Sequence, residues 1–392
     1  MRTFVLILLL LNLSSCWMLR AYKVRKLNLT DHKRLPSVPI EKSSTPFFFT
    51  NGSNLSKYKP IHASIDSFIT DTETAAFLLI RNDSLIYERY FMGFNDSTLF
   101  PSNSMAKSYT GTLVGIAMDE GLIQSDREPI THYLPELGKR DPRFHHITIR
   151  HLLDMRSGLR FNEGTYNLRD DAVKLGFRPK LEKHILKIKI AEKPGRFKYQ
   201  SINTQLLGLI VQRASKKPLQ QYLQEKLWKA IGTESRATWN VDSKKRKQVM
   251  ISAAINATAR DFAKLGRLYL EKGKWDGKKI LTSYWVSQVS SGDTMEKYGG
   301  YKNQFWNQRI TQAFRDSLRA TRSRRNKRHT KLISEQNSYY LSYRTDAFSA
   351  NGFMNQIVYI HPKKNIIIVR LGKLWPHTKD FMQTIYAFGE TL

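Results

Sequence analysis

Hydrophobic and polar residues follow a strand-like pattern at the two ends of this chain. Short runs rich in apolar and β-branched residues occur at 77–80, 85–91, 339–343, 355–360 and 366–371. Runs of this length and composition are typical of β-strands. The turn 362–365 separates the last two runs and predicts a hairpin, and we expect a closing helix over 378–388.

Between about residues 104 and 281, apolar residues recur instead at the three- and four-residue spacing of helices. The clearest helical segments are 148–155, 202–214, 219–228 and 259–272. In the last segment, Phe262, Leu265 and Leu268 fall on one face. Because strand-like runs flank this helical middle, we predict an α+β fold. Both chain ends would contribute to one antiparallel sheet, with the helical region inserted between them.

The composition indicates a globular protein with an unusually positive charge. The chain has 392 residues, 41% of them hydrophobic, and a formal net charge of +31. Such a charge favours contact with anionic envelope polymers, lipid headgroups or nucleic acid. Most of it is spread along the chain, but the segment 319–331 holds seven Lys or Arg and no acid and is expected to be a solvated loop. No aromatic interleaving or recognised motif accompanies it, so we expect no specific nucleic-acid partner.

The N-terminus has the pattern of a secretory signal. Arg2 precedes the apolar run 4–11 and the tetrapeptide Leu-Ser-Ser-Cys that ends at Cys16, which resembles the lipobox of bacterial lipoprotein signal peptides. The pattern predicts a signal peptide over 1–15 and a lipidated Cys16 that tethers the chain to the bacterial cell envelope, facing the periplasm or the exterior. An ordinary signal peptide, or an uncleaved anchor with an incidental cysteine, is the alternative.

The rest of the chain divides into a spacer and one folded domain. Residues 16–57 are basic and rich in Ser, Pro and Asn, which predicts a spacer, and 58–392 then forms a single domain. Cys16 is the only cysteine, which excludes an intramolecular disulfide and a cysteine-rich metal site. The histidines within 145–151 lack the i, i+4 spacing of a helical zinc site. We therefore expect no metal and no cofactor.

Ser104 and Lys107 are the strongest candidates for chemistry. Residues three apart in a helix share one face, so the lysine amine can accept the serine's proton and make it a nucleophile. Ser104 follows the helix breaker Pro101 and stands at the start of a helix, where free backbone N–H groups favour a developing oxyanion. The alternative is an ordinary first-turn serine next to a solvated lysine.

A second candidate segment is the loop 194–201, which leads into a helix. Its Tyr199 carries a phenol that can exchange a proton with a reacting group. Tyr199 can equally be a packing residue, and Ser201 can be the N-cap of the helix that begins at Ile202.

The order of these segments resembles a family: the serine β-lactamase and penicillin-binding-protein-like hydrolases. The branch is that of class C β-lactamases, serine esterases and 6-aminohexanoate-dimer hydrolases, and the resemblance covers about residues 60–390. It rests on SNSMAKSYTG at 102–111, HLLDMRSGL at 151–159, Tyr-Gln-Ser at 199–201, the segments 257–262 and 273–277, and SANG at 349–352. It implies a β-lactamase/transpeptidase-like fold in which Ser104 is acylated, Lys107 is the general base and Tyr199 is the catalytic tyrosine.

Two departures from the family pattern bear on the substrate. Ser201 stands where members that recognise penicillin usually have Asn, and serine recurs there in ester and linear-amide hydrolases of this branch. The segment 349–352 contains no Lys, Arg or His, so Ser349 is left as a weak partner for a substrate carboxylate. Asn351 and Gly352 are expected to line the pocket from the same strand.

The resemblance also places Tyr166 near the site. It lies in the loop after the Ser-Gly-Leu segment, where a tyrosine of the aminohexanoate-dimer hydrolases reaches the substrate, although a lone loop tyrosine is commonly a surface residue. The sequence therefore predicts a serine hydrolase for a small ester or linear amide. The alternatives are a D-Ala-D-Ala carboxypeptidase or β-lactamase-type enzyme, and a non-catalytic envelope-binding protein of the same fold.

Overall fold

The computed structural model describes most of the chain. The described residues are 17, 21, 28–53, 55–70, 72–164, 167, 169–291, 299–314, 331–335, 338–373 and 381–392. The predicted signal peptide, Cys16, Tyr166 and nearly all of the basic segment 319–331 lie outside them. Within the described part, no helix combines the length and the hydropathy that a membrane span needs.

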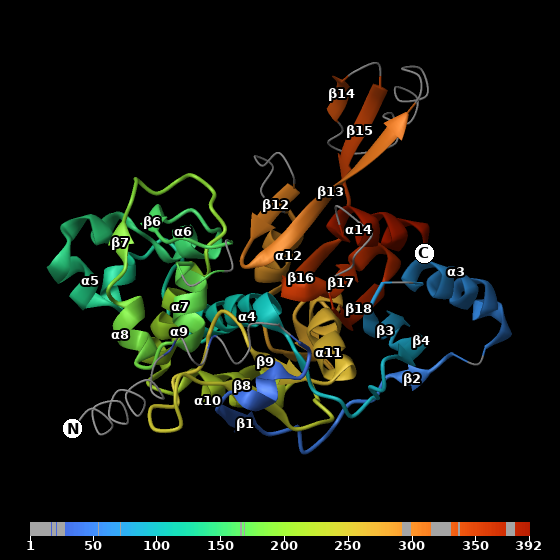
Figure 1. The fold of residues 1–392 in the computed structure, drawn as a ribbon, viewed down its shortest axis with the longest axis horizontal. Coiled ribbons are helices and arrows are strands. Elements are labelled where there is room, and N and C mark those ends of the chain that lie inside the picture. Colours follow the sequence, from blue (N-terminus) through green and yellow to red (C-terminus); the bar gives the residue numbers. More distant parts are fainter. Residues whose placement is uncertain are drawn as a thin grey trace, which may run out of the picture.

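A large sheet joins the two ends of the chain (Figure 1). Its order is β14 (Lys331–Glu335), β15 (Ser338–Arg344), β13 (Phe305–Phe314), β16 (Phe348–Gly352), β17 (Gln356–His361), β18 (Ile366–Gly372), β3 (Thr74–Arg81), β4 (Ser84–Tyr90) and β2 (Thr50–Asn51), with β12 (Gly299–Lys302) also paired to β13. All pairs are antiparallel except β2 with β4. The pairing of β18 with β3 confirms that both chain ends build one antiparallel sheet.

Apolar layers cover both faces of the central strands. In β3, Ala76 and Leu78 belong to the larger core, whereas Phe77 and Leu79 belong to a second core on the other face. The second core lies under α3 (Lys59–Ile69) and α14 (Phe381–Thr391). Successive side chains of a strand point to opposite faces, so burial on both sides explains why these strands are continuous apolar runs.

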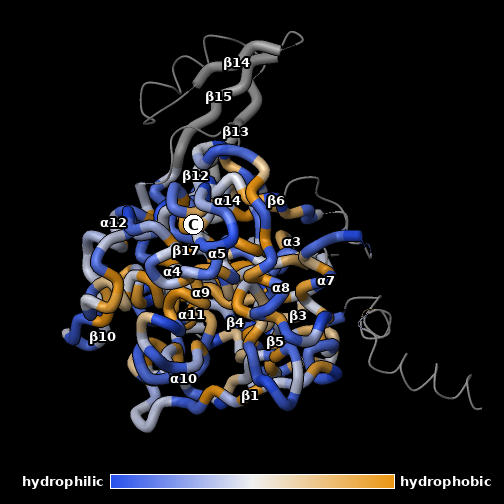
Figure 2. Tube along the Cα trace, turned by 90° about the vertical axis from the view of Figure 1, so that its left-hand side faces the viewer, coloured by the Kyte–Doolittle hydropathy of each residue, from blue (hydrophilic) through white to orange (hydrophobic). Residues whose placement is uncertain are grey.

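The larger core is built around a helix that is buried on all sides. This helix, α4 (Ala106–Asp119), has every residue from Ala106 to Ala117 buried. The other helices are α5 (Pro135–Arg140), α6 (Ile149–Leu153), α7 (Asp171–Phe177), α8 (Leu181–Ile185), α9 (Ser201–Ser215), α10 (Leu219–Leu223), α11 (Ala259–Leu270) and α12 (Ser283–Ser291). The predicted helix 219–228 is α10 followed by a π-helical turn, Gln224–Trp228. In Figure 2 the hydrophobic segments gather inside the body, around α4, α9 and α11.

A smaller sheet leads the chain into α4. It consists of β1 (Ser37–Ile40), β8 (Ala237–Asn240), β9 (Ile255–Ala257) and β5 (Phe100–Pro101). Two short hairpins, β6 (Leu159–Arg160) with β7 (Lys189–Ile190) and β10 (Lys274–Trp275) with β11 (Lys278–Lys279), complete the fold. β1 pairs with β8 over four residues. The folded region therefore begins before Tyr58, within the segment that the composition predicts to be a spacer.

Candidate active site

Ser104 and Lys107 are in contact at the start of α4. Ser104 lies in a 3₁₀ turn, Asn103–Met105, that leads directly into the helix. Lys107 Nζ donates a hydrogen bond of 2.8 Å to Ser104 Oγ. Ser104 is partly exposed, whereas Lys107 is only 1% exposed. A substrate can therefore reach the hydroxyl while the amine behind it is shielded from water.

The remaining contacts of Lys107 are with neutral groups. Its Nζ donates to the backbone carbonyl of Ser252 at 3.2 Å, and it lies 5.1 Å from the ring centroid of Tyr199. Gln205 on α9 donates to Ser252 Oγ at 3.1 Å. Among the described residues, no carboxylate forms an ion pair with Lys107. The sequence analysis did not identify Ser252, which contacts Lys107, or Gln205, which contacts Ser252. No motif links either residue to Lys107.

Tyr199 lies beside Lys107 in an aromatic cluster. Its ring stacks on Trp306 of β13, with centroids 5.2 Å apart and planes 29° apart, and meets Tyr301 edge-on at 5.8 Å. Phe197 contacts both of these partners. Packing therefore fixes the Tyr199 ring next to the amine of Lys107.

Ser201 has a partner that the sequence did not indicate. Its Oγ donates to Glu163 Oε1 at 2.5 Å, and its backbone N–H donates to Oε2 at 2.5 Å. A carboxylate at the N-terminus of α9 is favoured by the helix dipole. Ser201 is the first residue of α9 and Gln200 precedes it as the N-cap residue, so the predicted N-cap role of Ser201 is wrong.

The HLLDMRSGL segment fixes the position of α9. Ser157 Oγ donates to the side chain of Asn203 at 2.5 Å, and the Asn203 amide contacts Met155 Sδ at 3.3 Å. The Lys198 N–H also bonds to the Met155 carbonyl at 2.8 Å. This segment thus holds the loop that carries Tyr199.

β16 runs directly past the turn that carries Ser104. A Cβ atom on Gly352 would lie 2.3 Å from the Ser102 carbonyl oxygen and 3.2 Å from the Ser104 nitrogen. Only glycine allows such a close approach. Asn103 Nδ2 also donates to the Phe353 carbonyl at 2.8 Å. The end of β16 therefore lies beside the backbone N–H of Ser104.

Ser349 and Asn351, the other two predicted residues of this strand, differ in their burial. Ser349 is fully buried, and its Oγ lies 3.0 Å from the Tyr386 hydroxyl on α14. Its side chain thus faces the second core, away from the site. Asn351 is partly exposed near the end of the strand.

A buried arginine supports the turn that follows β16. Met354 and Asn355 have left-handed backbone conformations, with φ values of 62° and 60°. Arg370 donates to the carbonyls of Met354 at 2.9 Å and Asn355 at 3.2 Å, and Gln356 also donates to Met354 at 3.2 Å. Arg370 is fully buried, and this burial lowers its pKa to about 9. The apolar run around Arg370 conceals this role in the sequence.

Burial at the edge of the site keeps the Tyr301 phenol protonated. Tyr301 is 2% exposed. Its burial, together with the nearby Tyr199, Asp154 and Glu163, raises the pKa of Tyr301 well above its usual value. Among the described residues, its hydroxyl has no hydrogen-bond partner. Within the described residues, no group of three or more His, Cys, Asp or Glu side chains is arranged to hold a metal ion.

Known proteins resemble this chain in sequence and in fold. The Beta-lactamase family model matches residues 64–387. The 6-aminohexanoate-dimer hydrolase of Paenarthrobacter ureafaciens is 26% identical over 264 residues, which are 62% of this chain and 66% of that protein, so the match spans about two thirds of its length.

Solved structures share the fold. The structure named "Putative 6-aminohexanoate-dimer hydrolase from Bacillus anthracis" superposes with a TM-score of 0.72 at 24% identity, covering 94% of this chain and 92% of that one. A penicillin binding protein from Bacillus halodurans gives a TM-score of 0.60 at 14% identity, covering 84% and 100%.

Proposed function

The chain belongs to the beta-lactamase family, and from this premise we propose that it is a serine hydrolase that cleaves ester or linear amide bonds through an acyl-enzyme. The observation that carries the proposal is the 2.8 Å bond between the shielded Lys107 amine and the accessible Ser104 hydroxyl. A nucleophile and its base within hydrogen-bond reach are the elements that covalent catalysis requires.

In the acylation step, Ser104 Oγ attacks the substrate carbonyl while the Lys107 amine accepts the hydroxyl proton. The carbonyl oxygen becomes an oxyanion. The backbone N–H of Ser104 and one from the chain just after Gly352 are the proposed donors to it, since these two segments lie against each other. A fixed pair of backbone donors stabilises the transition state more than the ground state.

The leaving group needs a proton when the tetrahedral intermediate collapses. We assign this role to the Tyr199 hydroxyl. Lys107 Nζ lies 5.1 Å from the centroid of the Tyr199 ring, and the hydroxyl can pass to the leaving group the proton that Lys107 takes from Ser104. Water then attacks the acyl-enzyme by the reverse route and frees Ser104. Trp306 and Tyr301 act as positioning residues for the Tyr199 ring.

Three observations support an ester or a linear amide as the substrate. Residues 349–352 carry no cationic side chain, Ser349 faces the second core, and the buried Arg370 is used by backbone carbonyls. A β-lactam carboxylate therefore lacks a fixed cation on this strand. The name of the Paenarthrobacter relative, a 6-aminohexanoate-dimer hydrolase, agrees with linear amides.

Labelling with a fluorophosphonate tests the nucleophile. We expect the parent to be labelled and Ser104→Ala to lose all labelling. Ser108→Ala is the matched control, because Ser108 lies one helical turn further along α4 and bonds to the Gln304 carbonyl at 2.7 Å. Labelling retained by Ser104→Ala would assign the reaction to another residue, and an unlabelled parent would favour a binding protein of this fold.

A substrate screen tests the bond type. Purified protein should hydrolyse p-nitrophenyl esters or short linear amides much faster than nitrocefin or D-Ala-D-Ala peptides. Efficient nitrocefin hydrolysis would instead favour a β-lactamase or carboxypeptidase type.

We also propose that lipidation of Cys16 anchors the enzyme in the cell envelope. Its support is the signal-like pattern of 1–16. Cys16→Ser should then move the enzyme out of the membrane fraction. Unchanged fractionation would favour an ordinary signal or anchor.

A further inference from the structure

A strongly basic surface surrounds α7, α8 and β7. Two neighbouring cavities, of about 680 and 460 Å³, open on it and share Lys187. The cationic side chains that line them are Arg160, Lys174, Arg178, Lys180, Lys183, Lys187, Lys189 and Arg246. We call this surface, together with the adjoining residues 244–247, the α8 face.

The carboxylates of the α8 face are already engaged by partners. Asp171 forms an ion pair with Lys174 at 2.7 Å, and Glu182 pairs with Arg213 at 3.1 Å. Asp242 is buried and accepts hydrogen bonds from two backbone N–H groups at the start of α8. Apart from Lys174, none of the cations that line the two cavities forms an ion pair with a residue that the structure describes.

A run of four cations adds to the α8 face. Residues 244–247 have the sequence Lys-Lys-Arg-Lys, and all four are exposed. Asp242, just before this run, accepts hydrogen bonds from the backbone N–H groups of Lys180 and Leu181 at the start of α8, so the run lies next to α8. None of the four forms an ion pair with any residue that the structure describes. The emphasis on 319–331 in the sequence analysis overlooked this second concentration of charge.

The positive field of this face acts on a titratable neighbour. The pKa of His184 is lowered by its partial burial and by the charges of Arg178, Lys187 and Lys183. A lowered histidine pKa is what nearby cations produce.

Trp17 lies on the same face. Trp17 follows Cys16 directly, and the Arg178 guanidinium lies 5.1 Å from its ring centroid. If a lipid on Cys16 holds the chain at a membrane, the α8 face, which includes Arg178 next to Trp17, would therefore lie toward that membrane.

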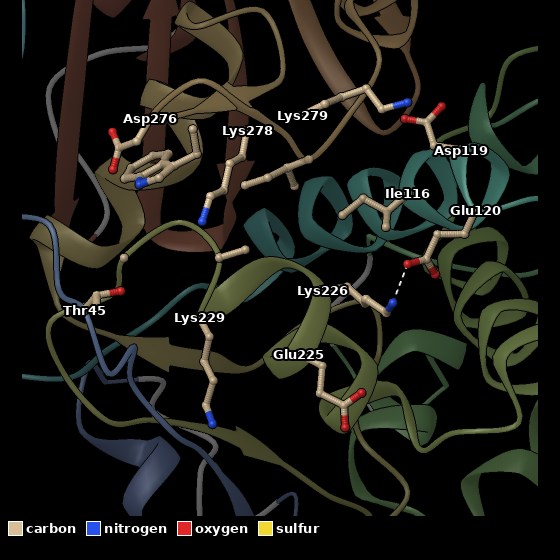
Figure 3. A pocket seen from close by; sticks show the side chains of 14 residues that line it. Thr45, Ile116, Asp119, Glu120, Glu225, Lys226, Lys229, Asp276, Lys278 and Lys279 are labelled. Carbon is tan, nitrogen blue, oxygen red and sulfur yellow. Dashed lines mark hydrogen bonds and ion pairs between the residues drawn. The ribbon is translucent and has the colours of Figure 1, made fainter.

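Another part of the surface shows that this bias is local. The cavity in Figure 3, of about 530 Å³, lies at the C-terminal end of α4 and is lined by equal numbers of lysines and carboxylates. These are Lys226, Lys229, Lys278 and Lys279 with Asp119, Glu120, Glu225 and Asp276. β10, next to this cavity, and α7 lie on opposite sides of the molecule in Figure 2.

We propose that the α8 face docks on an anionic lipid bilayer. Lys and Arg side chains close to an anionic surface each add to binding, and a basic patch supplies the second signal that a single lipid anchor needs for stable attachment. The position of Trp17 favours a bilayer over a soluble polyanion. The proposal does not rest on the hydrolase activity.

Vesicle sedimentation tests it with the full chain in a Cys16→Ser background, which removes the lipid but keeps the N-terminal segment in every sample. The test variant combines Lys183→Gln, Lys187→Gln, Lys244→Gln and Arg246→Gln, all at exposed positions. The control combines Lys229→Gln, Lys274→Gln, Lys278→Gln and Lys279→Gln, which are also exposed and remove the same charge.

On vesicles of phosphatidylglycerol and phosphatidylcholine, the test variant should bind about 100-fold more weakly than the parent, and the control within a few-fold of it. Added salt should weaken binding of the parent. Equal losses in both variants, or parental binding by the test variant, would overturn the proposal. Binding to DNA or an anionic polysaccharide without binding to vesicles would overturn it as well.

Fluorophosphonate labelling and a melting curve show whether each variant is folded. Should the test variant not fold, the salt response of the parent decides, because salt-independent vesicle binding contradicts docking by charge.

Discussion

The turn that leads into α4 and the end of β16 border the same proposed reacting position but contribute in different ways. The 3₁₀ turn and the first residues of α4 supply side chains, namely the Ser104 hydroxyl and the Lys107 amine. β16 supplies backbone, brought close by Gly352 and held by Arg370 from β18. The first kind of contribution follows from residue types at a fixed spacing. The second depends on which segments meet in three dimensions.

The largest effect is expected on the α4 side. Lys107→Met keeps most of the buried stem and removes the amine, so kcat/KM for a p-nitrophenyl ester should fall by about 10³-fold or more, within the range of a lost acid–base group. A melting curve checks the fold. Activity within ten-fold of the parent would mean that another group deprotonates Ser104.

On the β16 side, Gly352→Ala should lower kcat by about 10²-fold. The added Cβ would lie 2.3 Å from the Ser102 carbonyl oxygen, so the strand must move away from Ser104 and one proposed oxyanion donor is lost. Gly176→Ala is the control, because nothing lies within 4 Å of its added Cβ. Equal kcat values for the two variants would contradict a contribution of β16 to catalysis.

Tyr199→Phe separates chemistry from packing. The ring keeps its contacts with Trp306 and Tyr301, and only the hydroxyl is lost. We expect kcat to fall by about 10²-fold, KM to stay nearly unchanged and the melting curve to be unaffected. If kcat stays within a few-fold of the parent, the proton travels through Lys107 or Tyr166, and Tyr199 is a packing residue.

Arg370→Lys weakens the support of β16 without touching substrate. Lysine cannot donate to Met354, Asn355 and Thr72 together as the guanidinium does. The turn should shift and lower kcat by about ten-fold, with little change in KM. Thr74→Val removes an Arg370 contact on the side away from the turn and should preserve kcat. Equal losses in both variants would indicate a general loss of stability.

These differences explain how far the sequence could predict the structure. The sheet from both ends, the strands 77–80 and 366–371 and the Ser104–Lys107 pair follow from local patterns, and the structure has them. The contacts of Ser201 with Glu163, 38 positions away, and of Arg370 with the turn after β16 join residues that no local pattern connects.

Strand pairing explains the remaining misses. β13 was not predicted, because its sequence lacks a clear alternation, and β1 lies in a polar segment that only its pairing with β8 makes a strand. The sequence also did not show which face of the sheet each β16 side chain points to. In the structure, Ala350 faces the larger core while Ser349 faces α14.

The smallest expected effect tests which face Ser349 points to. If Ser349 bound substrate, Ser349→Ala would raise KM, whereas its observed bond to Tyr386 predicts a purely structural loss. We expect KM and kcat for a p-nitrophenyl ester to stay within about two-fold, and the free energy of unfolding to fall by about 1 kcal/mol, as for one buried hydrogen bond. Denaturant unfolding and steady-state kinetics on the same sample measure both. A raised KM at unchanged stability would place the Ser349 hydroxyl on the substrate side of β16, and the β16 contribution would then include a side chain after all.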